Sequence, residues 1–129
     1  MRVYIASPYT EGDPETNVAI AIDAATYLRR RGHAPFVPHL NHFWAKRDKT
    51  SNYEIWMEYD RQWIPVCEAV IRLKGKSKGA DREVLQARKL GLPVYYSVEE
   101  FLAASGHAGY ESNAITERTG RAVAASIRP

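Results

Sequence analysis

The sequence of 129 residues contains a single cysteine, Cys67. One cysteine excludes an intramolecular disulfide and any zinc site built from several cysteines, so we expect a buried, reduced thiol. The sequence also lacks an apolar run of about eighteen residues and a signal-peptide pattern at its N-terminus, so neither a membrane span nor secretion is indicated. The expected location is the cytoplasm, with no membrane as a partner.

A long basic arm is absent as well. The net charge of +3 arises from short clusters at residues 29–31, 46–49 and 74–78. Binding of duplex nucleic acid requires a broad basic surface, so a duplex is not an expected partner. Separated basic clusters fit a small anionic substrate better.

Length and composition indicate one compact domain. At 45% hydrophobic and 26% charged residues, the chain can bury a core but has no room for a second domain. After residue 104 the composition changes to Gly, Ala, Ser, Asn and Arg. We therefore expect an α/β domain over residues 1–104 and a tail over 105–129 that is either mobile or ordered by a partner chain.

Short apolar or β-branched runs alternate with segments of helical spacing. The runs predict strands at residues 2–6, 34–37, 69–73 and 93–96. The helical segments run from Pro14 to Arg31, over 52–64, from about Ala80 to Gly91, and over 98–104. Strands that alternate with helices predict an α/β fold with a doubly wound parallel sheet of four to five strands.

Several predicted helix ends carry residues suited to them. Asp13 can cap the first helix and Gly32 can stop it. Pro65 is expected to end the helix over 52–64, since proline cannot donate to the helical hydrogen-bond ladder. Ser97 and Glu100 form a capping box for the last helix.

Segment 69–91 joins a predicted strand, a loop of glycine, serine and lysine, and a helix. Ligands of parallel α/β sheets gather at such junctions, because a helix N-terminus leaves backbone N–H groups unpaired and carries positive partial charge. Glu83 is expected in the first turn of that helix, where the dipole should favour an ionised carboxylate at neutral pH that can act as a nucleophile. The alternative is a glutamate that only stabilises the helix.

A second carboxylate lies within an aromatic stripe. Trp56, Asp60 and Trp63 fall on one face of the helix over 52–64, with Tyr59 beside them. If that face is buried, loss of hydration should raise the pKa of Asp60 and make it a proton donor. The alternative is an aspartate hydrogen-bonded to a backbone group or a tyrosine.

Segment 39–51 is polar with interleaved aromatic residues, and we interpret it as an irregular binding loop. Its histidines, His39 and His42, could share a ligand if the segment turned helically, but no third ligand is spaced to complete a metal site. No metal is therefore expected. One histidine is expected to contact substrate or a carboxylate, while the other supports the loop.

The loop before Glu83 offers a possible phosphate site. Ser77 lies among Lys74, Lys76 and Lys78, so its hydroxyl and the nearby N–H groups could hold a phosphate. The alternative is a solvated basic loop. The loop is not a Walker sequence, because the G-K-[ST] element is missing.

Three stretches resemble one enzyme family. They are VYIASPY at the start, the helix carrying Asp60, and SKGADRE followed by QARKLGLPVYY, spread over roughly residues 2–96. They are similar to the nucleoside 2-deoxyribosyltransferases and to relatives that hydrolyse the N-glycosidic bond of nucleoside 5′-monophosphates. The resemblance implies a flavodoxin-like fold, a homodimer or larger assembly, and no cofactor.

The resemblance also implies roles for individual residues. Glu83 matches the glutamate of the Ser/Asp-x-Gly-x-x-x-Glu motif, which attacks the anomeric carbon. Tyr4 matches a tyrosine of the first strand and would orient this nucleophile, and Asp60 matches an acidic residue that would assist departure of the base. The three residues occur along this chain in the same order as their counterparts in the family.

Two chemistries remain open within the resemblance. Six positions before the nucleophile, the transferases carry an aspartate that serves the sugar hydroxyls, and the monophosphate hydrolases carry a serine that serves the phosphate. Ser77 favours a nucleotide, since a carboxylate there would repel phosphate. Pro8 and Thr10 oppose that assignment, because they stand where the hydrolases carry a serine and an arginine.

The expected reaction is hydrolysis of the N-glycosidic bond of a nucleoside 5′-monophosphate. Base exchange and a catalytically silent nucleotide-binding module are the alternatives. The residues expected to contact the sugar or phosphate are Ser7, Pro8, Ser77 and Gly79. Those expected to contact the base are His39 or His42, and Trp44.

Overall fold

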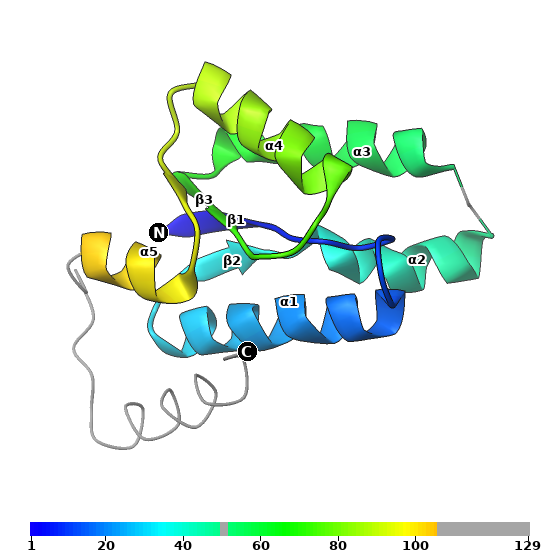
Figure 1. The fold of residues 1–129 in the computed structure, drawn as a ribbon, viewed down its shortest axis with the longest axis horizontal. Helices are drawn as coiled ribbons and strands as arrows, with labels where there is room; N and C mark the ends of the chain where they lie inside the picture. The colour runs from blue at the N-terminus through cyan, green and yellow to red at the C-terminus, as the bar shows by residue number, and fades with distance from the viewer. Residues whose placement is uncertain (50–51, 106–129) are drawn as a thin grey trace.

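The computed structural model describes residues 1–49 and 52–105 (Figure 1). The predicted tail therefore lies, apart from Ser105, outside the described residues. The elements in chain order are β1 (Arg2–Ala6), α1 (Pro14–Arg30), β2 (Ala34–Phe36), the 3₁₀ turn η1 (Pro38–Leu40), α2 (Asn41–Asp48), α3 (Tyr53–Arg61), the 3₁₀ turn η2 (Ile64–Val66), β3 (Ala69–Arg72), α4 (Lys78–Lys89), β4 (Val94–Tyr95) and α5 (Val98–Ala104).

The sheet has four parallel strands in the order β2-β1-β3-β4. This flavodoxin-like arrangement confirms the predicted α/β class and the parallel sheet. The central strands are β1 and β3, and the chain order reverses between them. In open parallel sheets ligands bind beyond the carboxyl ends of the strands at such a reversal, so the loops after β1 and β3 frame the place where a site is expected.

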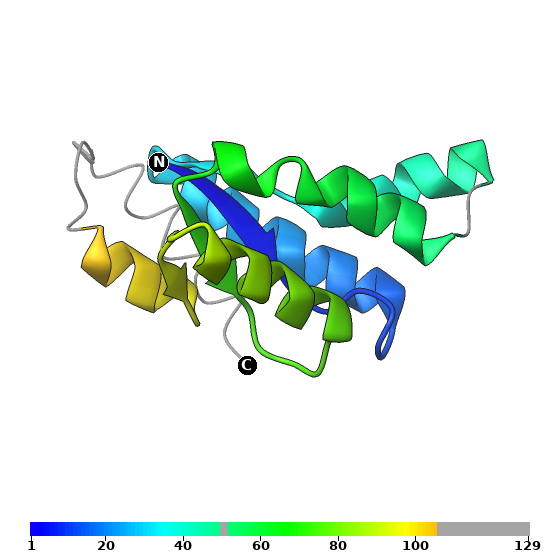
Figure 2. The same cartoon turned by 90° about the horizontal axis from the view of Figure 1, so that it is seen from above.

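Helices cover both faces of the sheet (Figures 1 and 2): α1 and α5 on one face, α3 and α4 on the other. Successive residues of β1 serve the two faces in turn. Val3 and Ile5 pack with the core of α1 and α5, whereas Tyr4 and Ala6 join the core that includes Ala80 of α4. The alternation of a buried strand thus places the Tyr4 side chain beneath α4.

Several predicted helix ends are confirmed. The Asp13 side chain accepts a backbone N–H at 3.1 Å at the start of α1, and Gly32 follows its end with a φ of 87°. The hydroxyl of Ser97 accepts the Glu100 N–H at 2.9 Å at the start of α5. Cys67 is a buried free thiol, as expected. No helix within the described ranges is long and apolar enough to span a membrane.

The prediction of an irregular loop over 39–51 is wrong as far as the segment is described. Residues Pro38–Leu40 form η1, and α2 follows directly over Asn41–Asp48. The α2 sequence, NHFWAKRD, shows no apolar stripe, and its first turn has no side-chain cap. Helical structure here depends on contacts with other elements, which periodicity does not reveal.

Two predicted helix boundaries also differ from the structure. The helix predicted over 52–64 ends at Arg61, and Pro65 lies within η2 instead of ending the helix. Helix α4 begins at Lys78, two residues before Ala80, because the hydroxyl of Ser77 caps it by accepting the Ala80 N–H at 3.0 Å. The earlier start changes the position of Glu83 within the helix.

Candidate functional site

A cavity of about 430 Å³ opens beside the carboxyl ends of β1 and β3. Its walls come from the loop after β1, from η1 and α2, from α3, and from the start of α4. A volume of this order suits a small-molecule ligand. The lining residues are Ser7, Tyr9, Thr10, Glu11, Pro38, His39, Asn41, His42, Ala45, Tyr53, Trp56, Met57, Asp60, Ser77, Lys78, Gly79, Ala80 and Glu83.

Glu83 lines this cavity and contacts Tyr4, which belongs to the core and does not line the cavity. The hydroxyl of Tyr4 donates a hydrogen bond to Oε2 of Glu83. Tyr4 is fully buried, and Glu83 is 7% exposed. The fold therefore brings together a glutamate and a tyrosine 79 positions apart, and aligns one carboxylate oxygen with a fixed donor.

The expectation of an ionised Glu83 at neutral pH is wrong for this structure. Burial, and to a lesser extent the nearby Asp60, raises the pKa of Glu83 to about 8. The hydrogen bond from Tyr4 acts in the opposite direction and does not cancel this increase. Because α4 begins at Lys78, Glu83 lies in its second turn, where the helix dipole is weak. Loss of hydration therefore outweighs the dipole.

The raised pKa makes the stability of the fold depend on pH. The folded protein keeps a proton on Glu83 that the unfolded chain loses above pH 4.5, so the free energy of unfolding should fall as pH rises from 4.5 to about 8. Glu83→Gln cannot ionise and should be more stable than wild type at pH 8, by roughly 1–3 kcal/mol. The difference should narrow towards pH 5. Thermal melts across this range test it, and a difference that does not change with pH would contradict a buried, ionisable Glu83.

Asp60 approaches the cavity from α3 and is buried. Burial raises its pKa to about 7, in the direction predicted from the sequence. Its hydrogen-bond partner is the side-chain amide of Asn41, whose Nδ2 donates to Oδ1 at 2.7 Å. The sequence did not single out Asn41, because α2 itself was not predicted.

The aromatic stripe around Asp60 is only partly buried. Trp63 is 40% exposed, and Trp56 is half-buried. Trp44, 50% exposed, packs its ring against Trp56 and Tyr59 at 5.2 and 5.4 Å between ring centroids. It does not line the cavity, so Trp44 supports the wall on which Trp56 lies.

Each histidine of the cavity has its own set of partners. Nε2 of His39 lies 3.1 Å from the carbonyl oxygens of Ser7 and Pro8, to which it donates. Burial lowers the pKa of His39, so the ring is neutral and its Nδ1 is an acceptor. This Nδ1 is buried and has no hydrogen-bond partner among residues 1–49 and 52–105.

His42 has both ring nitrogens engaged. Nδ1 lies 2.7 Å from the Tyr9 hydroxyl, and Nε2 lies 2.9 Å from Oε1 of Glu15. The two histidines therefore do not share a ligand. Across the described part of the chain, no group of three or more His, Cys, Asp or Glu side chains is arranged to hold a metal ion.

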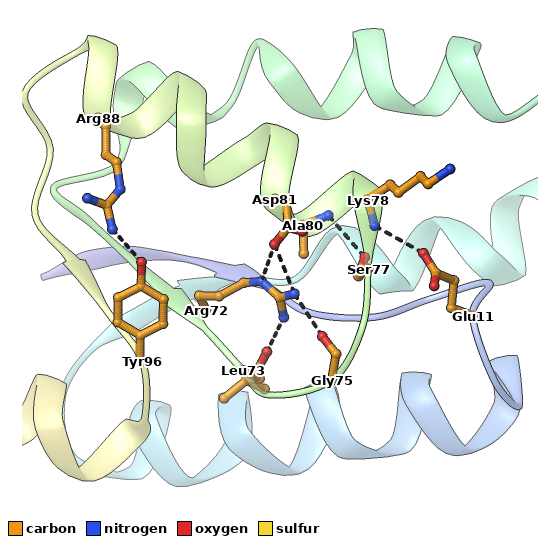
Figure 3. A network of polar contacts seen from close by, with 10 residues as sticks. All are labelled: Glu11, Arg72, Leu73, Gly75, Ser77, Lys78, Ala80, Asp81, Arg88 and Tyr96. Atoms are coloured by element: carbon orange, nitrogen blue, oxygen red, sulfur yellow. Dashed lines mark hydrogen bonds and ion pairs between the residues drawn. The ribbon is translucent and has the colours of Figure 1, made fainter.

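The start of α4 is occupied by groups of the chain itself (Figure 3). The buried hydroxyl of Ser77 caps the helix, so the alternative of a solvated loop does not apply to Ser77. The Lys78 N–H donates to Oε1 of Glu11 at 3.0 Å. At Gly79 a side chain would collide with the hydroxyl of Tyr53, so glycine allows α3 and α4 to approach closely here.

Arg72 shapes the loop between β3 and α4 (Figure 3). Its guanidinium donates to the carbonyl oxygens of Leu73 and Gly75 and pairs with Asp81 at 3.1 Å. Gly75 has a φ of 119°, and Pro8 lies where a side chain on Gly75 would be. The loop conformation is thus fixed by a buried arginine that the sequence did not single out.

Several predicted site residues lie elsewhere. Pro8 lines a second hollow, of about 340 Å³, together with Lys74 and Lys76, and none of these three lines the main cavity. Of the three lysines expected around a phosphate, Lys78 alone lines the main cavity. The other predicted contacts Ser7, His39, His42, Ser77 and Gly79 do line it, with Asp60 and Glu83.

Comparisons with known proteins identify a family and a fold. Residues 1–97 match the profile of a family described as a domain of unknown function, DUF7768. None of the curated proteins matches this chain in sequence. A solved structure of a 2-deoxyribosyltransferase from the psychrotolerant bacterium Bacillus psychrosaccharolyticus has a similar fold, with a TM-score of 0.52 and 22% identity. The similarity covers 73% of this chain and 69% of that chain.

Proposed function

This chain belongs to the DUF7768 family, and we propose that it cleaves the N-glycosidic bond of a nucleoside or nucleoside 5′-monophosphate through a covalent intermediate on Glu83. The observation that carries the proposal is the arrangement of Glu83, Tyr4 and Asp60: a buried glutamate held by a tyrosine hydroxyl, sharing a cavity with a carboxyl group of raised pKa. The fold shared with a 2-deoxyribosyltransferase supports this class of substrate.

In the first step, an oxygen of ionised Glu83 attacks C1′ of the sugar. The C1′–N bond breaks, its electron pair passes to the base, and the protonated carboxyl of Asp60 gives the base its proton. The bond from the Tyr4 hydroxyl to Oε2 favours the charged form of Glu83 and leaves the other oxygen for attack. The products are a glycosyl ester on Glu83 and a neutral free base.

In the second step, water attacks C1′ and gives a proton to the Asp60 carboxylate. The ester bond breaks, free sugar leaves, and both carboxyl groups return to their starting forms. A second base that attacks C1′ in place of water would instead give base exchange. The alternative reaction thus differs only in the acceptor.

The mechanism predicts a narrow, bell-shaped dependence of rate on pH. The reactive form carries one charge, on Glu83, and one proton, on Asp60. Burial raises the two pKa values to about 7 and about 8, and because the groups interact these values describe the pair. Below about pH 7 both carboxyl groups carry a proton, and above about pH 8 neither does. Between these values the pair holds one proton, and the reactive form is the minor arrangement in which that proton lies on Asp60. The kcat/KM profile should peak between these values; a rate that stays flat from pH 5 to 9 would contradict this assignment.

Two unpaired polar atoms of residues that line the cavity support a base contact there. His39 Nδ1 is an acceptor and Trp56 Nε1 is a donor, and both are buried without a hydrogen-bond partner among the described residues. His42 has no free ring nitrogen, since Tyr9 and Glu15 engage both. His39 is therefore the better candidate of the two histidines, and Trp56 replaces Trp44 as the candidate aromatic residue.

Chromatography of free base after incubation with a panel of nucleosides and 5′-monophosphates tests the proposal. Release of base without an acceptor identifies a hydrolase. Release only when a second base is present identifies a transferase, and binding without release identifies a nucleotide-binding module and refutes the proposed activity. A homodimer or larger assembly, implied by the sequence resemblance, stays a prediction.

A further inference from the structure

The N-terminus of α4 is the place where an α/β protein of this kind would hold a substrate phosphate, and here a carboxylate lies at that place. Oε1 of Glu11 accepts the Lys78 backbone N–H at 3.0 Å (Figure 3). A second donor, the Ala80 N–H, is taken by the hydroxyl of Ser77 at 3.0 Å. Two donors that could serve a phosphate are thus already satisfied by the chain.

The loop that carries Glu11 is held in place. The side-chain amide of Asn17 donates to the backbone carbonyl oxygens of Glu11 and Tyr9, at 2.9 and 2.8 Å. Gly12 follows with a φ of 90°, a backbone conformation that favours glycine and turns the chain towards α1. The backbone of the loop that carries Glu11 is therefore fixed near the start of α4, and the contact with the Lys78 N–H places its carboxylate.

The lining of the cavity also offers a phosphate little positive charge. Among the described lining residues the carboxyl groups are Glu11, Asp60 and Glu83, and the only ammonium group is that of Lys78. Lys74 and Lys76 line the second hollow and not the main cavity, whereas Glu11 lines both. A phosphate at the start of α4 would meet the Glu11 carboxylate at close range, where like charges repel strongly.

We infer that Glu11 excludes a 5′-phosphate from this site and selects an uncharged nucleoside. The inference rests on the proposed function and names the substrate class of the same cavity. It reverses the preference for a nucleotide that Ser77 suggested, because the carboxylate of Glu11 accepts the Lys78 N–H next to Ser77. A sugar hydroxyl, unlike a phosphate, can donate a hydrogen bond to a carboxylate at this position.

The test compares Glu11→Gln with a matched control. Glutamine keeps an oxygen that can accept the Lys78 N–H but removes the charge. Glu58→Gln makes the same change of net charge on the surface of α3, at a residue that pairs with Arg61 and does not line the cavity. Glu11→Ala is a second variant, in case the glutamine amide donates to the phosphate.

Binding is measured by calorimetry with the four 2′-deoxynucleosides and their 5′-monophosphates, on a Glu83→Gln background that prevents turnover. With Glu11 present, nucleosides should bind more tightly than monophosphates. Both Glu11 variants should shift the ratio of affinities towards the monophosphate by at least about tenfold, and this gain should shrink as salt increases. Glu58→Gln should leave the ratio unchanged.

An unchanged ratio in both Glu11 variants would overturn the inference. A preference for monophosphates with Glu11 present, or no binding of either class, would overturn it too. The proposed activity is tested separately, by base release from the protein with Glu83 intact. If base is released equally well from nucleosides and monophosphates, the role of Glu11 is refuted and the proposed activity stands. If Glu11 controls which class binds but no base is released, the proposed activity is refuted and the role of Glu11 stands.

Discussion

Glu83→Gln should reduce the rate of base release by about 10³-fold or more. Glutamine has nearly the shape of glutamate and can still accept the hydrogen bond from Tyr4, but its neutral amide cannot attack C1′ to form the ester. The loss should appear in kcat, since the cavity and its other contacts remain. Steady-state assays with saturating substrate, at a pH near 7.5, measure it.

The control for this variant is again Glu58→Gln, which replaces an exposed glutamate of α3 with the same amide. It should retain wild-type kcat. Thermal melts establish that Glu83→Gln is folded, and at pH 8 it should be the more stable protein. A folded Glu83→Gln protein with near wild-type turnover would remove Glu83 from the mechanism.

Asp60→Asn should lose most of its activity on substrates whose base leaves only with a proton, by about 10²–10⁴-fold. Asparagine preserves the size of the side chain and can hydrogen-bond to Asn41, but it cannot give up a proton at neutral pH. The fall in rate on the alkaline side should also disappear, because the variant has no donor proton to lose. The remaining rate should rise with pH as Glu83 ionises.

A substrate with a cationic base separates this role from a structural one. The base of a 7-methylpurine nucleoside carries a positive charge and can leave without a proton, so Asp60→Asn should retain most of its activity on it. Equal losses on 7-methylpurine and ordinary nucleosides, or lost stability with unchanged kcat, would show that Asp60 is structural.

The parts of the fold that the sequence predicted well are those that local signals determine. The strand at 2–6 and the helix at 98–104 have the predicted bounds, because an apolar β-branched run and the Ser97 cap are each encoded within a few residues. Helix α2 was missed because its sequence has no apolar period. Its buried residue His42 is held by Tyr9 and Glu15, which lie far away in the chain.

The candidate site was predictable in its residue types but not in its electrostatics. Glu83, Asp60 and Tyr4 were identified by position, yet the protonation of Glu83 was predicted wrongly because burial is a property of the folded chain. The contact of Glu11 with Lys78 spans 67 positions, so no local pattern revealed it. The capping role of Ser77 was not predicted, because it depends on where α4 begins.

The central claim is that Glu83 becomes covalently attached to the sugar. The most direct test is mass spectrometry of the protein quenched with acid during turnover, followed by proteolysis. The account predicts a peptide containing Glu83 that is heavier by one dehydrated sugar residue, and absence of this adduct in Glu83→Gln. Turnover with a burst of free base but no adduct on that peptide, or an adduct on a different residue, would contradict it.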